Sequence, residues 1–336
     1  RLVLSISAET GVSIEAENTL IIFDEVQEVP KALTSLKYFY ENAPQYAIVA
    51  AGSLLGVALH QGTSFPVGKV DFLDLYPLNF REFLCAMGEK QFVSMLDSCD
   101  TQMVTVFKTK YIERLREYYF VGGMPEVVKD FSEKKDYNRV RAIQKNLINY
   151  YQQDFSKHAE IKLVPRLNLV WNSIPMQLAK ENKKYIYGQV REGSRAKDFE
   201  LAIQWLLDCG LIHKVQRIQK PDLPLKAYID FDAFKLFLVD IGLLIAMTDL
   251  DAKVIIEGNK IFTEFKGSLT EQYILQQLIS DVGVIPYYYS TQNSKGEIDF
   301  LVQGKTSVIP IEVKAEENLK AKSLKAFCEK YQPSYA

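Results

Sequence analysis

The sequence contains few of the residues from which metal clusters and disulfide scaffolds are built. Its 336 residues include four cysteines and three histidines. The cysteines lie far apart, with no Cys-x-x-Cys pair. This spacing argues against a zinc ribbon and against a disulfide-stapled fold, and it favours reduced thiols in the cytoplasm.

The chain also lacks a long hydrophobic run and an excess of charge of one sign. The longest apolar stretch, Phe237–Met247, is short and contains Asp240, so no membrane-spanning segment is expected. The 40 basic and 42 acidic residues give a net charge of −2. This balance excludes a globally basic nucleic-acid wrapper but allows a local basic patch. The chain begins with Arg1 rather than Met, which predicts a processed or incomplete protein.

A short apolar run near the N-terminus, Leu20–Phe23, ends in the acidic residues Asp24 and Glu25. Such a run suits a strand buried on both faces of a parallel sheet, and ligands of open α/β sheets bind beyond the carboxyl ends of the strands. The pattern predicts a Walker B motif. Asp24 would hold the Mg²⁺ of a bound nucleotide, and Glu25 would polarise the attacking water. The alternative is an ordinary acidic loop after a buried strand.

A helix that begins at Pro30 and a second apolar run, 46–51, complete a strand–helix–strand unit. Ser53 follows the second run and is a candidate contact for the γ-phosphate. No Gly-x-x-x-x-Gly-Lys-[Ser/Thr] phosphate loop precedes Leu20. The near match at 62–70 has one residue too many between its glycines and follows the acidic pair, so we do not interpret it as a phosphate cradle.

The middle of the chain predicts helices and then a winged helix. Residues 77–159 are mostly helical in pattern, with a break at 122–125, and 160–250 form a separate small unit. Its recognition helix would be 197–209, and strands 211–215 and 225–229 would form the wing. Five basic residues are candidates for contact with DNA phosphates: Lys183, Lys184, Arg191, Arg195 and Lys197. The alternative is a packing domain with a solvated basic face.

Two strand-like runs near the C-terminus carry carboxylates. The run 298–302 contains Asp299, and 308–313 contains Glu312, which Lys314 follows two positions later. Glu312 and Lys314 are two apart and therefore share one face of their strand, and Asp299 lies on the adjacent strand. The two carboxylates can thus converge on one divalent cation with the lysine beside them. This set suits metal-activated attack of water on a phosphodiester, and Glu271 could add a further carboxylate. The alternatives are a solvated charged hairpin and an inactive fold that keeps its carboxylates.

Four segments of the chain resemble a family of prokaryotic AAA+ ATPases that carry a long C-terminal region. The segments are LIIFDEVQEVPKALTSLKYF, AAGSLLG, LYPLNFREFL and VGGMPEVV. The resemblance extends over essentially the whole chain and implies binding of ATP and Mg²⁺. It assigns the Walker B roles to Asp24 and Glu25, the sensor role to Ser53 and the start of a helical lid to 122–125. Members carry a phosphate loop ahead of the Walker B strand, so the chain resembles such a protein without its first segment. Lys69 lies where relatives often have Arg.

The order of elements at the C-terminus resembles the PD-(D/E)xK nuclease fold. That resemblance implies that Asp299 and Glu312 bind Mg²⁺ or Mn²⁺, that Glu271 is an accessory acid and that Lys314 is the catalytic lysine. The final residues could begin a further strand, which predicts a domain that is incomplete at its C-terminus.

The sequence therefore predicts an α/β multidomain protein in four parts. They are a partial P-loop NTPase (AAA+) core with a parallel sheet at 1–76, a helical lid at 77–159, a winged-helix-like domain at 160–250 and a PD-(D/E)xK-like domain at 251–336. We expect an ATP-binding AAA+-type ATPase that acts with nucleic acid, with hydrolysis only in a longer parent protein. DNA and further copies of the chain are the candidate partners. The alternative is a non-catalytic interaction module with a degenerate nuclease fold.

Overall fold

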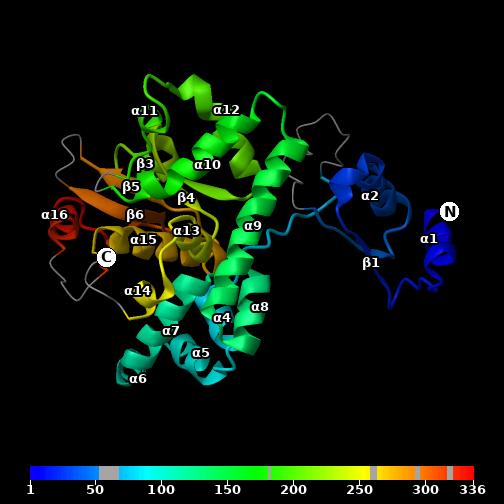
Figure 1. Ribbon diagram of the computed structural model, residues 1–336, viewed down its shortest axis with the longest axis horizontal. Coiled ribbons are helices and arrows are strands. Elements are labelled where there is room, and N and C mark those ends of the chain that lie inside the picture. Colours follow the sequence, from blue (N-terminus) through cyan, green and yellow to red (C-terminus); the bar gives the residue numbers. More distant parts are fainter. Residues whose placement is uncertain (53–67, 181–182, 258–262, 292–295, 316–320) are drawn as a thin grey trace. The chain divides into compact units, whose positions relative to one another are not determined.

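The computed structural model describes residues 1–52, 68–180, 183–257, 263–291, 296–315 and 321–336. The chain forms two compact units, one made of residues 1–75 with 204–210 and the other of 76–203 with 211–336. Helices predominate among the described residues, whose strands form a two-stranded and a five-stranded sheet (Figure 1). The prediction of an α/β multidomain protein is confirmed at this level.

The first unit contains the predicted strand–helix–strand arrangement. Its elements are α1 (Leu2–Thr10), β1 (Leu20–Phe23), the 3₁₀ turn η1 (Val26–Glu28), α2 (Pro30–Asn42) and β2 (Ala47–Ala50). Strands β1 and β2 pair in parallel, with Leu20 opposite Ala47. Ile21 is buried, whereas Leu20 and Ile22 are 52% and 60% exposed. The expectation that β1 is buried on both faces is therefore wrong in this structure, because α2 packs on one face only, where Phe39 contacts Phe23.

Helices make up the first half of the second unit. They are α4 (Phe80–Ala86), α5 (Lys90–Asp97), α6 (Thr101–Val106), α7 (Lys108–Val121), α8 (Pro125–Lys134), α9 (Tyr137–His158), α10 (Val164–Leu178), α11 (Tyr187–Val190) and α12 (Ala196–Asp208), of which 204–208 belong to the first unit. Side chains that accept hydrogen bonds from free backbone N–H groups fix several starts. Asn79 and Glu82 form a reciprocal capping box at α4, and Asp136 caps α9.

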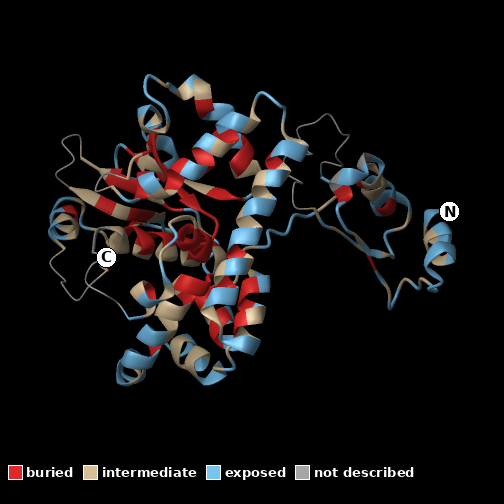
Figure 2. Cartoon of the chain, in the orientation of Figure 1, coloured by how far each residue is buried: buried red, intermediate tan, exposed pale blue. Residues whose placement is uncertain are grey.

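The second half of this unit is built around one sheet with strand order β4-β3-β5-β6-β7. Its strands are β3 (Ile212–Ile218), β4 (Ile229–Leu238), β5 (Tyr287–Ser290), β6 (Glu297–Gln303) and β7 (Val308–Ile311). The remaining elements are η2 (Leu225–Tyr228), α13 (Ile241–Met247), α14 (Ala252–Ile256), α15 (Thr263–Ser280) and α16 (Lys322–Tyr331). Strands β3 and β5 pair in parallel, and the other neighbours pair antiparallel. Figure 2 shows the buried residues concentrated along these strands and the helices beside them.

This sheet corrects the predicted division of the chain. Strands β3 and β4 come from the predicted winged-helix-like part and β5–β7 from the predicted nuclease-like part, so one sheet crosses the boundary at 250/251. The second wing strand was also misplaced, because 225–228 form η2 and the strand runs from Ile229 to Leu238. Leu225 lies in η2 rather than in a strand, and its N–H donates to the Gln303 side chain, 2.8 Å away.

A buried carboxylate joins the helices to the sheet. Asp240 follows β4 and is fully buried. Its Oδ2 accepts from the Gly123 N–H at 2.6 Å and its Oδ1 from the Leu243 N–H at 2.9 Å. Gly123 in turn accepts a hydrogen bond from the Leu78 N–H at 2.7 Å. The predicted lid start at 122–125 is therefore part of the same compact unit as the sheet.

We predict that Gly123→Ala destabilises the second unit severely. A Cβ at this position would lie 2.1 Å from the Leu78 carbonyl oxygen, which is main chain and cannot rotate away. Overpacking of this kind should lower the free energy of unfolding by about 3 kcal/mol or more. Urea denaturation followed by circular dichroism measures the change.

Gly267→Ala is the matched control, because this helical glycine has open space around its missing Cβ. It should leave the unfolding free energy unchanged or raise it by up to about 1 kcal/mol. Equal effects of the two substitutions would contradict the close approach at Gly123.

Candidate functional site

The predicted Walker B residues lie at the carboxyl end of β1. Asp24 and Glu25 are exposed, and the Glu25 N–H donates to Asp24 Oδ1 at 3.0 Å. Glu25 has a φ of 48°, a left-handed conformation that a non-glycine residue adopts at a cost of about 1–3 kcal/mol. The Val26 N–H donates to the Ala51 carbonyl at 3.0 Å, which brings the end of β2 beside the acidic pair.

Ser53 and Lys69 are the other two residues that the sequence picks out in this part of the chain. Ser53, the predicted γ-phosphate contact, lies outside the described residues. Lys69 lies 3.8 Å from Glu41 and 4.7 Å from the centre of the Tyr40 ring, so its ammonium rests on α2.

The predicted nuclease-like residues come together at the edge of the five-stranded sheet. Asp299 lies in β6, and Glu312 follows β7 directly. Because Phe300 pairs with Ile311, Asp299 and Glu312 fall opposite each other one step beyond that pair. Asp299 Oδ2 accepts from the Val313 N–H at 2.7 Å. Glu271, on α15, is 4% exposed, and its charge acts on Asp299.

Lysines neutralise this carboxylate cluster. Lys183 forms an ion pair with Glu271 Oε1. Lys235, in β4, lies 2.5 Å from Glu297 Oε1 and 3.5 Å from Glu271 Oε2, and Lys314 lies 2.5 Å from Glu312 Oε1. Sequence reasoning missed Lys235 and Glu297. The signal was present, because a lysine within the apolar run of β4 needs a buried acidic partner.

Burial and neighbouring charges shift the pKa values of the cluster. Burial, and then the charge of Glu271, raise the pKa of Asp299 to about 7. Burial also acts to raise the pKa of Glu271, but the charges of Lys235 and Lys183 outweigh it and lower the pKa. With Asp299 protonated, three carboxylates (Glu271, Glu297, Glu312) face three ammonium groups (Lys183, Lys235, Lys314). The cluster is then close to neutral.

Two carboxylate oxygens in the cluster have no hydrogen-bond partner. Glu271 Oε2 and Glu312 Oε2 are buried and accept no hydrogen bond, although the Lys235 ammonium lies 3.5 Å from Glu271 Oε2. A buried acceptor left in this state costs about 1–3 kcal/mol, and more when it is charged. These two atoms mark positions at which a cation or a hydrogen-bond donor would be stabilised.

The donor types in the cluster suit Mg²⁺ or Mn²⁺, but their present arrangement is not that of a metal site. Among the described residues, no group of three or more His, Cys, Asp or Glu side chains is placed to hold a metal ion. The predicted ligands Asp299, Glu312 and Glu271 share one cluster, yet lysine ammonium groups supply its positive charge. A divalent cation would therefore have to displace at least one ion pair.

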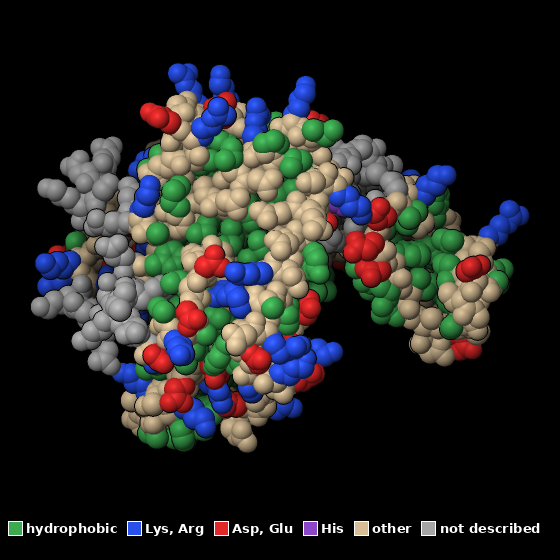
Figure 3. All heavy atoms as spheres, in the orientation of Figure 1, with side chains coloured by type: hydrophobic (Ala, Val, Ile, Leu, Met, Phe, Trp, Pro, Cys, Tyr) green, Lys and Arg blue, Asp and Glu red, His purple; other side chains and the backbone are tan. Residues whose placement is uncertain are grey.

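The predicted DNA-contacting residues divide between two environments. Lys183 is not part of an open basic face, because its side chain is 13% exposed and pairs with Glu271. Lys183, one of the five residues predicted to contact DNA phosphates, therefore lies in the carboxylate cluster. Arg191, Arg195 and Lys197 are exposed, whereas Lys184 is half-buried. Lys and Arg side chains project at the top of Figure 3, where Figure 1 places α11 and α12.

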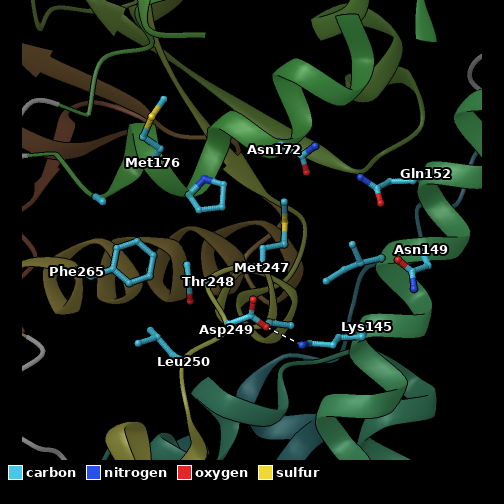
Figure 4. A pocket seen from close by; sticks show the side chains of 14 residues that line it. Lys145, Asn149, Gln152, Asn172, Met176, Met247, Thr248, Asp249, Leu250 and Phe265 are labelled. Atoms are coloured by element: carbon cyan, nitrogen blue, oxygen red, sulfur yellow. Dashed lines mark ion pairs between the residues drawn. The ribbon is translucent and has the colours of Figure 1, made fainter. Parts of the chain in front are cut away.

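A separate groove of about 730 Å³ lies between helices α9, α10 and α15 and the end of α13. Figure 4 shows the amides of Asn149, Gln152 and Asn172 on its wall opposite Phe265. Its charged lining side chains, Lys145 and Asp249, pair with each other at 2.7 Å. The groove therefore offers binding surface rather than acid–base or metal chemistry.

Within the part of the chain that the structure describes, no helix is both long and apolar enough to span a membrane.

Family models match three parts of the chain. An AAA domain model matches residues 3–84, a domain of unknown function (DUF8612) matches 112–254, and a second domain of unknown function (DUF4143) matches 266–335. The first match covers β1, the acidic pair and β2. It supports an AAA-type, ATPase-like protein with a P-loop NTPase fold in this region, a class whose members generally use ATP and Mg²⁺.

No curated protein matches the sequence of this chain. Among solved structures, the Walker-type ATPase PABY2304 of Pyrococcus abyssi is similar, with 13% sequence identity and a TM-score of 0.43. The alignment covers 73% of this chain and 75% of that one. A likeness at this level carries no argument about the function of this chain.

Proposed function

We propose that this chain belongs to an ATP-binding AAA+-type ATPase that acts on nucleic acid through its C-terminal domain. The observation that supports the ATPase part is the pair Asp24 and Glu25 at the carboxyl end of a parallel strand, inside the segment matched by the AAA domain model. Asp24 would hold the Mg²⁺ that accompanies ATP, and Glu25 would orient the attacking water. The strained backbone at Glu25 is consistent with such a role, because strain of this kind concentrates at functional sites.

We predict weak binding of Mg-ATP by residues 1–336, with a Kd on the order of 1 mM and no steady turnover. The chain has no sequence in which successive backbone N–H groups and a lysine grip the phosphates. Asp24→Asn should abolish the Mg²⁺-dependent part of the binding measured by calorimetry.

Glu9→Gln, which removes an exposed carboxylate from α1, is the control and should bind as the parent does. Micromolar binding with continuous phosphate release would contradict the prediction, and so would equal losses in the two variants.

The second part of the proposal is metal-dependent cleavage or binding of phosphodiesters at the carboxylate cluster. It rests on two buried oxygens without hydrogen-bond partners, Glu271 Oε2 and Glu312 Oε2, in the cluster that also contains Asp299. A bound Mg²⁺ or Mn²⁺ would activate water and polarise the phosphoryl group. Asp299, Glu312 and Glu271 would hold it. The Lys314 side chain is 37% exposed, so its ammonium can reach a substrate and stabilise developing negative charge.

We predict that Mn²⁺ raises the melting temperature of the protein and that Asp299→Asn and Glu312→Gln remove the rise. Mass action at a hundredfold excess over Kd corresponds to about 2.7 kcal/mol of stabilisation. Glu329→Gln, on the exposed face of α16, should keep the full response.

Lys314→Ala separates metal binding from cleavage. It should leave the Mn²⁺-dependent rise in place and abolish cleavage of a plasmid or an oligonucleotide. Metal binding without cleavage by the parent protein would favour the alternative, a degenerate nuclease fold that serves as an interaction module. A melting temperature that does not respond to millimolar Mn²⁺, with or without a DNA duplex, would end the proposal of a metal site.

Contact with nucleic acid is proposed for the exposed basic residues Arg191, Arg195 and Lys197, with Lys184 at the margin. We predict that the triple reversal of Arg191, Arg195 and Lys197 to Glu weakens DNA binding and lowers the slope of log K against log salt by about 0.9 per lost phosphate contact. Fluorescence anisotropy at several salt concentrations measures both quantities.

Reversal of Lys90, Lys108 and Lys129, which are exposed on α5, α7 and α8, makes the same change in net charge. It should alter the affinity much less. Similar losses in the two triple variants would show that net charge, and not this surface, governs binding.

A further inference from the structure

The basic segment and the carboxylate cluster share one residue, Lys183. Its side chain is 13% exposed and its ammonium pairs with Glu271, whereas Arg191, Arg195 and Lys197 further along the same segment face solvent. The segment therefore connects a surface suited to phosphates with the interior of the proposed metal site.

The main chain next to Lys183 is fixed at the edge of β4. The Tyr185 N–H donates to the Phe234 carbonyl at 2.8 Å, and the Ile186 N–H donates to Gln177 Oε1 at 3.1 Å. Lys183 lies two residues before Tyr185, and its flexible side chain reaches from this anchored segment to Glu271. Rotation about its side-chain bonds can move that charge without unfolding the segment.

The two lysines that contact Glu271 differ in their freedom to leave. The Lys235 side chain is 1% exposed, is held by Glu297 at 2.5 Å and lies over the Tyr288 ring at 4.8 Å. Lys183 has Glu271 as its ion-pair partner and retains contact with solvent. Lys183 is therefore the exchangeable positive charge of the cluster, and Lys235 is the permanent one.

We propose that Lys183 occupies the cation position at Glu271 until a divalent cation and a nucleic-acid phosphate enter together. The cation then takes Glu271, and the phosphate takes the released ammonium. Both residues of the broken ion pair thus gain a new partner of opposite charge, so neither Glu271 nor Lys183 is left buried and unpaired. This inference rests on the proposed metal-dependent function.

The exchange makes the binding of metal and of nucleic acid mutually dependent. Metal alone must leave an ammonium without its carboxylate, and nucleic acid alone must leave Glu271 without Lys183. Coupling of this kind is reciprocal and typically changes affinities by 5- to 150-fold. We expect a short DNA duplex to strengthen Mn²⁺ binding by the wild-type protein about tenfold.

Calorimetric titration with Mn²⁺, with and without the duplex, tests the proposal on the wild-type chain and three variants. Lys183→Met should bind Mn²⁺ about tenfold more tightly than wild type in the absence of DNA and should lose most of the response to DNA. Lys183→Arg keeps the charge and should behave as wild type. Lys90→Met removes an exposed charge from α5 and should retain both the wild-type Mn²⁺ affinity and the coupling.

The outcomes separate this proposal from the function on which it rests. If wild type and Lys183→Met bind Mn²⁺ equally well, or if DNA does not strengthen binding by wild type, Lys183 is not an exchangeable occupant and the metal site stands without it. If none of the proteins binds Mn²⁺ with or without DNA, the metal site itself is refuted and the exchange with it.

Discussion

The second unit depends on a fully buried carboxylate. Asp240 follows β4, accepts main-chain hydrogen bonds from Gly123 and Leu243 and accepts a further one from the Gln276 side chain at 3.2 Å. Burial raises the pKa of this carboxyl group, and the hydrogen bonds act in the opposite direction. Segments from three distant parts of the sequence thus meet at one side chain. The main chain at Gly242 approaches the main chain at Val121 so closely that a Cβ on Gly242 would lie 2.5 Å from the Val121 carbonyl oxygen.

The same constraint positions the candidate site. Helix α15 supplies Gln276 to the Asp240 network and Gln272 to the end of β4, where the Gln272 side chain bonds both the N–H and the C=O of Leu238. These bonds fix the register of α15 against the sheet. Glu271, next to Gln272, is then held beside Lys235 of β4 and Asp299 of β6. A helix shifted by one turn would move Glu271 away from Asp299 and Glu312, which the sheet brings together.

Much of this arrangement could be predicted from local patterns, and the rest could not. Short apolar runs identified β1 and β2, and the spacing of Glu312 and Lys314 identified the edge of the sheet that carries the carboxylates. The shared sheet was missed because pairing of β3 with β5 is a long-range choice, which alternation along one strand does not encode. The role of Lys183 was missed for a related reason. A lysine beside other basic residues resembles a solvated patch until the helix that carries its partner is in place.

The central claim is that a lysine-balanced carboxylate cluster accepts a divalent cation when it exchanges one of its ion pairs. A crystal structure of the protein grown with Mn²⁺ and a short DNA duplex tests this most directly, because manganese is located by its anomalous scattering. The account predicts an anomalous peak bounded by Glu271, Asp299 and Glu312, with the Lys183 ammonium on a phosphate. An intact Lys183–Glu271 ion pair with no manganese between these carboxylates would contradict it.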